Sequence, residues 1–146
     1  MTRTGFITHL GTAATVSLLL LASAAQAQSR AELTADLTGA GQTPAGDPDG
    51  AGLARIKVDP AKPEVCYELA VTNITPAVAA HIHKGKVGEI GPPVVNLTAP
   101  ATGSSSGCTA VAAELAQAIL ADPAGYYVNV HTPDFRPGAV RGQLKK

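Results

Sequence analysis

Short stretches in which apolar and polar residues alternate are the feature that most limits how this chain can fold. Leu33, Ala35 and Leu37 alternate with threonine and aspartate, and the same two-residue period recurs at 54–58 and 65–72. Successive side chains of a β-strand point to opposite faces, so this period places the apolar side chains together on one face. The pattern therefore predicts half-buried strands.

Glycine and proline divide the chain into many short elements, with 15 Gly and 11 Pro in 146 residues. We expect strands at 32–38, 54–58, 65–72, 78–83, 94–97, 126–131 and 139–144. Val111, Leu115 and Ile119 recur at helical spacing, which predicts one helix at 111–121. Residues 103–107 are expected to form a flexible serine-rich connector. The predicted fold class is all-β: an antiparallel immunoglobulin-like sandwich or Greek-key barrel of about seven strands with one short helix.

The N-terminal segment has the features of a secretory signal peptide. Arg3 precedes an apolar run, and the segment ends in Ala25-Gln26-Ala27, an A-x-A cleavage site. The run is too short to span a bilayer, although an uncleaved anchor is the alternative. We predict a signal peptide at residues 1–27 and a single domain at 28–146, located in the periplasm or secreted, with no membrane span after cleavage.

An exported protein has an oxidising environment, which favours a disulfide between its two cysteines, Cys66 and Cys108. Closing a loop of this length would stabilise the fold by about 4 kcal/mol in the chain-entropy model. The two residues lack the C-x-x-C spacing of redox sites, so a redox or metal role is the less favoured interpretation. We predict a structural disulfide.

Charge and motifs exclude several classes of function. The chain has 11 basic and 11 acidic side chains, so no broad electrostatic surface for nucleic acid is expected. Only 3% of the residues are aromatic, which is too few for a base-stacking platform. The sequence contains no G-x-S-x-G elbow, P-loop or dinucleotide fingerprint. No catalytic residue is assigned from these motifs, and none of them indicates a protein partner.

Three histidines of the predicted domain lie in strand-like segments. Alternation around Ile82 places His81 and His83 together on the face opposite the apolar residues. In 126–131, valines occupy the core positions, so Tyr127, Asn129 and His131 are expected to point away from the core. By the same reasoning, Arg141 and Gln143 point outward from the last strand. His81, His83 and His131 are therefore the candidate metal ligands.

Imidazole nitrogen suits copper, zinc, iron or nickel, and the chain has no methionine beyond Met1 to add a soft ligand. The sequence alone does not place His131 beside the other two. The alternative interpretation is three unrelated surface histidines, because H-x-H by itself is a weak motif.

Four segments around these histidines form a distinctive set: AHIHKG at 80–85, GPPVV at 91–95, YYVNVHT at 126–132 and GAVRGQL at 138–144. Together they resemble the CHRD domain, a module named after chordin that also occurs singly in secreted bacterial proteins. The resemblance covers about residues 31–144 and implies an immunoglobulin-like or barrel-like β fold. It implies little chemistry, because fold-level likeness does not transfer function.

A looser resemblance connects the chain to copper and copper-zinc superoxide dismutases, β-barrels in which an H-x-H strand and a later histidine hold copper. This resemblance implies that His81, His83 and His131 are copper ligands and that Arg141 guides the anion. The chain lacks a further histidine to bridge two metals and an evident zinc subsite. Only a copper-only version is therefore implied.

These inferences predict an exported binding module with one copper ion in a three-histidine site. One alternative is a copper-dependent enzyme similar to superoxide dismutase, in which copper exchanges an electron with superoxide. The other is a structural or adhesion module of the cell envelope, in which the histidines only form hydrogen bonds. A site with a single metal ion requires that all three rings meet, and only the tertiary structure can place them.

Overall fold

The structure is a computed structural model that describes residue 1 and residues 30–146. The predicted signal peptide and its cleavage site after Ala27 lie outside the described residues. Residues 30–146 contain eight strands and one α-helix. They are β1 (Ala31–Thr38), β2 (Ala51–Asp59), β3 (Glu64–Thr72), β4 (Ala79–Lys84), β5 (Pro93–Leu97), β6 (Ser104–Ala110), α1 (Ala113–Ala121), β7 (Tyr126–His131) and β8 (Val140–Gln143).

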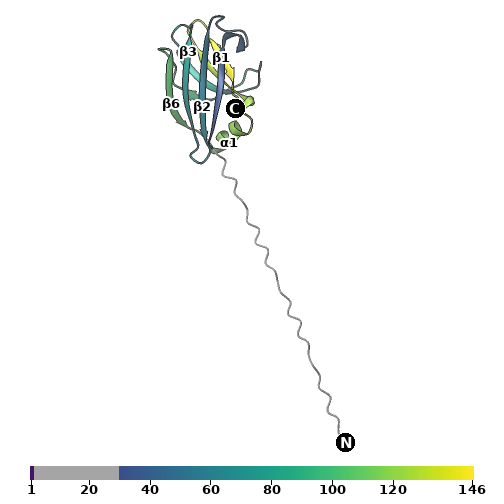
Figure 1. The fold of residues 1–146 in the computed structure, drawn as a ribbon. Coiled ribbons are helices and arrows are strands. Elements are labelled where there is room, and N and C mark those ends of the chain that lie inside the picture. The colour runs from purple at the N-terminus through teal and green to yellow at the C-terminus, as the bar shows by residue number, and fades with distance from the viewer. Residues whose placement is uncertain (2–29) are drawn as a thin grey trace.

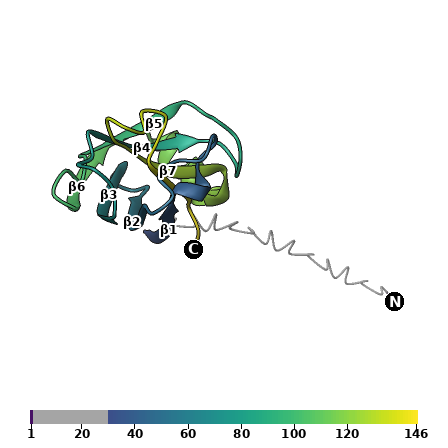
Figure 2. The same cartoon turned by 90° about the horizontal axis from the view of Figure 1, so that it is seen from above.

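The eight strands form one antiparallel sheet in the order β5-β4-β7-β8-β1-β2-β3-β6. The sheet curls into a nearly closed barrel, with β1, β2, β3 and β6 forming the wall in front in Figure 1. Seen from above, β5 and β4 lie across the interior from β1 and β2 (Figure 2). The all-β antiparallel fold class predicted from the sequence is confirmed, in its barrel form.

Side chains close the seam between the two terminal strands of the sheet. Ser105 on β6 donates a hydrogen bond to the carbonyl of Thr98 at 2.7 Å, and Thr109 donates to the carbonyl of Asn96 at 3.3 Å. The Tyr67 hydroxyl on β3 accepts from the Thr98 amide at 2.9 Å. The seam therefore depends on hydroxyl groups instead of a backbone ladder.

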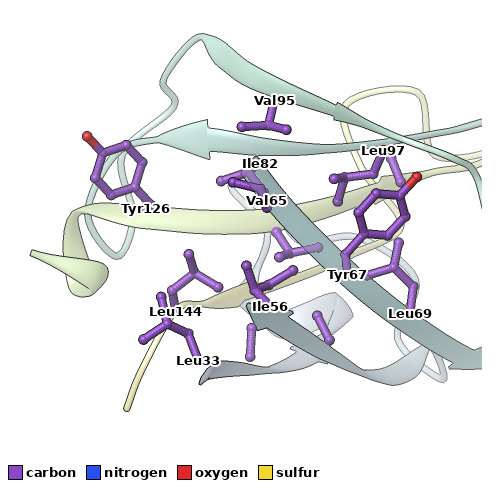
Figure 3. Close-up of a cluster of buried hydrophobic side chains, with 14 of the residues drawn as sticks. Leu33, Ile56, Val65, Tyr67, Leu69, Ile82, Val95, Leu97, Tyr126 and Leu144 are labelled. Carbon is purple, nitrogen blue, oxygen red and sulfur yellow. The ribbon is translucent and has the colours of Figure 1, made fainter. Parts of the chain in front are cut away.

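The alternating apolar residues meet inside the barrel, as their period predicts. Leu33, Ile56 and Val65 are fully buried, and Ile82 faces them from the opposite wall. Figure 3 shows these side chains converging between the strands. Helix α1 lies at one end of the barrel (Figure 1) and adds Ala116 and Ile119 to the core. In the described part of the chain, no helix has the length and hydropathy needed to cross a membrane.

The structure corrects the predicted connector at 103–107. Residues Ser104–Ala110 form strand β6, paired with β3 from Glu64↔Ala110 to Ala70↔Ser104. Small polar residues have little intrinsic strand preference, and the pairing with β3 supplies the order that the sequence pattern lacks. The barrel consequently has eight strands instead of about seven.

The predicted helix at 111–121 begins two residues later, at Ala113. The amide of Val111 donates a hydrogen bond to the carbonyl of Pro63 at 3.0 Å, which holds this residue in the connection from β6. The helical spacing predicted Val111 as part of the helix, because its side chain packs against the same core as the side chains of α1. Apolar spacing locates a buried face better than it locates a helix terminus.

Cys66 and Cys108 form a disulfide, which confirms the predicted pairing. The two residues are direct partners in the β3–β6 register, with their Cα atoms 3.9 Å apart. Cys66 is half-buried and Cys108 exposed, so the bridge lies outside the core and fastens the last strand of the sheet.

We predict that the double variant Cys66→Ser/Cys108→Ser loses up to about 4 kcal/mol in its free energy of unfolding, because the unfolded chain regains the freedom of the 42-residue separation. Urea denaturation followed by circular dichroism measures this loss. Wild-type protein treated with dithiothreitol serves as the control and should unfold with the variant. An unchanged urea midpoint would show that the disulfide does not stabilise the fold.

Candidate metal centre

Two neighbouring strands bring the three predicted ligands together. His81 and His83 lie on β4, and His131 is the last residue of β7. The antiparallel register pairs Ala79 with His131 and His81 with Asn129. Residues two apart on a strand share a face, so His131 lies diagonally across from His81 on the face that carries both β4 histidines. The three residues form what we call the histidine cluster.

The rings of the histidine cluster are close enough to share one ion. His81 and His131 have ring centroids 5.1 Å apart, and His81 and His83 have centroids 5.5 Å apart. One ligand nitrogen from each residue lies within 4.8 Å of those of the other two. The cluster that the sequence could only suggest is therefore present as a geometric unit.

Backbone carbonyls determine which nitrogen of two rings is available. His83 Nδ1 lies 2.8 Å from the carbonyl oxygen of Gly91, and His131 Nδ1 lies 2.8 Å from that of Arg136. A carbonyl oxygen only accepts hydrogen bonds, so both Nδ1 atoms carry the proton and both Nε2 atoms carry a lone pair. This arrangement of an outer carbonyl and an inner free nitrogen is typical of histidine metal ligands.

The two free Nε2 atoms have different surroundings. His131 Nε2 lies 3.1 Å from Nδ1 of His81, which acts as the donor because the His131 proton is on Nδ1. His83 Nε2 is buried and has no hydrogen-bond partner in residues 30–146. A buried polar atom without a partner costs about 1–3 kcal/mol, unless a bound species satisfies it.

Burial favours the neutral form of the two β4 histidines. Burial, followed by the nearby His131 and His83, lowers the pKa of His81. Burial also lowers the pKa of His83, and the charge of Arg141 acts in the same direction. Neutral imidazole is the form that binds a metal, so these shifts favour binding near neutral pH.

Side chains on the outward face of β7 and β8 are buried, although they lie outside the barrel core. Tyr127 and Asn129 are 2% and 3% exposed, and Arg141 is 3% exposed. Gln42, in the long connection between β1 and β2, donates hydrogen bonds to the Asn129 side chain and to the carbonyl of Val140. Loops cover this face, so its polar side chains form a second buried layer outside the barrel core.

Arg141 fastens the 85–92 loop to this layer. Its two terminal nitrogens donate to the carbonyls of Glu89 and Lys86, each at 2.7 Å, and its guanidinium carbon lies 3.3 Å from the Tyr127 ring centroid. Burial lowers the pKa of Arg141. The residue that the dismutase resemblance implies as an anion guide is therefore buried, and its guanidinium donates to backbone carbonyls.

Tyr127 and Gly91 support His83, and sequence analysis missed both roles. The Tyr127 ring stacks on His83 with centroids 4.9 Å apart, and its hydroxyl accepts from the Gly91 amide at 3.2 Å. The carbonyl of the same glycine receives the His83 proton. The alternation of 126–131 placed Tyr127 on the histidine face, but the β4–β7 register was needed to set it opposite His83.

We predict that the metal-free protein loses stability as the pH falls from about 7 to about 5, because His81 and His83 have lowered pKa values when folded and the unfolded chain then binds more protons below their ordinary pKa of 6.5. Above that value this contribution is fully present. His83→Gln should flatten the dependence in thermal unfolding, whereas Lys84→Ala at the adjacent exposed position should not. Equal slopes in all three proteins would contradict the assignment.

A second group, Glu64 with Cys66 and Cys108, also brings potential ligand atoms together. Both sulfur atoms are in the disulfide, so this group lacks a thiolate ligand. The histidine cluster is the stronger candidate for a metal centre.

One protein-family model matches nearly the whole of the described barrel. The model of the CHRD domain family matches residues 33–144, which include every strand from β2 to β8 and most of β1. No curated protein and no solved structure matches the chain. The family match spans the barrel and all three histidines, and the chain belongs to the CHRD domain family.

Proposed function

We propose that this CHRD domain is an exported module that binds one metal ion, with copper favoured, through His81, His83 and His131. The observation that carries the proposal is the set of three imidazole nitrogens within 4.8 Å of one another. Two of the rings are oriented by backbone carbonyls, and the free nitrogen of His83 is buried without a partner. A bound ion would satisfy that atom.

The donor set favours copper over harder cations. All three donors are imidazoles, which suit copper and zinc, and copper(II) binds nitrogen ligands more tightly than zinc in the Irving–Williams order. Asp134, in the loop that follows His131, is not in this donor set. Its carboxylate accepts a hydrogen bond from the Thr75 hydroxyl at 3.1 Å. Three protein ligands would leave a further position on the ion for water or another molecule.

Export is part of the same proposal. The leader-like sequence at 1–27 supports it, and so does the disulfide, because such bonds persist in oxidising compartments.

A copper-dependent redox enzyme similar to superoxide dismutase is the second candidate. One observation favours it: His81 and His131 border a surface pocket through which a small molecule could reach a bound ion.

We predict that the metal-stripped protein binds one equivalent of copper with a rise in its thermal midpoint, because the ion binds only the folded state. His131→Ala should lose both effects, because a ligand nitrogen is removed. Isothermal titration calorimetry and differential scanning calorimetry measure them, with zinc titrated in parallel. Asn96→Ala is the matched control, because Asn96 is exposed on β5 directly opposite His81.

The outcome distinguishes the candidate functions. Absence of saturable binding to wild type would overturn the proposal and leave a structural or adhesion module. Tight binding that persists in His131→Ala would place the ion elsewhere. If one equivalent binds as expected, a superoxide dismutation assay of the copper-loaded protein tests the second candidate, and inactivity would leave a binding module.

We predict that Tyr127→Phe weakens copper binding by about ten-fold, because loss of the hydroxyl frees Gly91, whose carbonyl orients His83. Competition with a chelator of known affinity measures the change. The fold should persist, because the ring that stacks on His83 remains. Wild-type affinity in the variant would show that the hydroxyl does not position His83.

A further inference from the structure

A surface pocket lies beside the histidine cluster. It has a volume of about 500 Å³ and is lined by Val78, Ala79, His81, His131, Thr132, Pro133 and Arg136. This volume is within the range of pockets that take small organic molecules. His83 does not line the pocket, so the pocket borders the cluster on the side of the His81–His131 pair.

Hydrogen bonds of His131 reach both Val78 and Arg136, which line the pocket. Its carbonyl accepts a hydrogen bond from the Val78 amide at 2.9 Å, and its Nδ1 donates to the Arg136 carbonyl at 2.8 Å. The 132–138 loop is braced from within, since the Phe135 amide donates to the buried Thr132 hydroxyl at 3.2 Å. The lining residues are therefore held in place around one ligand of the cluster.

The pocket combines a positive charge with an apolar wall. Arg136 is exposed, and within residues 30–146 no carboxylate lies within ion-pairing distance of it. The nearby acid, Asp134, bonds to Thr75 and is not part of the lining. Val78 is 62% exposed, and it lines the pocket together with Pro133.

We propose that this pocket binds a small organic carboxylate, with its charged end on Arg136 and its apolar part against Val78 and Pro133. Guanidinium recognises carboxylate through paired hydrogen bonds, and valine and proline offer apolar contact to the remainder of the molecule. The pocket does not require the metal ion of the proposed function. A copper ion held by the histidine cluster would add positive charge beside the pocket, because His81 and His131 line it.

Benzoate is the probe, titrated by calorimetry into the metal-free and the copper-loaded protein. We expect one saturable site in the metal-free form and tighter binding in the copper-loaded form. Acetate lacks the apolar part and benzamide lacks the charge, so both should bind more weakly than benzoate. Amide chemical shifts of the metal-free protein should move around His131 and Arg136, which locates the site.

Arg136→Gln should weaken benzoate binding by about ten-fold or more, because a charged hydrogen-bond partner is lost. Val78→Ser should weaken it through the apolar part. Arg55→Gln is the matched control, since Arg55 is exposed on β2 and lies outside this pocket. All three positions are exposed, so the variants are expected to fold.

Failure of this proposal is distinguishable from failure of metal binding. One outcome is that copper fails to bind while benzoate binds the metal-free protein and Arg136→Gln weakens that binding. This result would support the pocket proposal and contradict the metal site. The pocket proposal is overturned if benzoate shows no saturable binding in either form. It is also overturned if benzamide binds as well as benzoate, or if Arg136→Gln and Arg55→Gln have the same effect.

Discussion

The antiparallel pairing of β4 with β7 is the constraint on which the candidate site depends. Its register sets His131 opposite Ala79 and Tyr127 opposite His83, so one pairing positions both the third ligand and the ring that supports the second. A one-residue shift of register would move the histidines of β4 to the barrel interior and Ile82 to the outside. Burial of Ile82 in the core opposes such a shift, and core packing thereby maintains the geometry of the cluster.

A buried polar layer connects the barrel to this cluster. Within residues 30–146, the buried guanidinium of Arg141 forms no ion pair, and two backbone carbonyls and the Tyr127 ring compensate for its desolvation. Those contacts hold the 85–92 loop against the sheet, and the loop supplies the Gly91 carbonyl that orients His83. A charged residue that contacts none of the histidine nitrogens thus contributes to the direction in which a ligand nitrogen points.

Periodicity predicted the strands whose apolar residues line the core, because a strand buried on one face alternates apolar and polar residues. Periodicity missed β6, because its serine-rich sequence shows no such alternation. This strand is ordered by its pairing with β3 and by the disulfide. Periodicity placed Arg141 on the outward face of its strand but gave no sign that this residue is buried there. Alternation separates the two faces of a strand, and it contains no information on whether a distant loop covers the outer one.

The sequence by itself determined the all-β class, the partnership of the two cysteines and the identity of the three candidate ligands, because these follow from side-chain alternation and from the few residues able to do the chemistry. Only the tertiary structure decided that His131 meets His81, that carbonyls of Gly91 and Arg136 set the free nitrogens, and that a pocket lined by the exposed Arg136 borders the pair. These contacts join residues from separate strands and loops. Their distances depend on strand register and loop path, which no local pattern specifies.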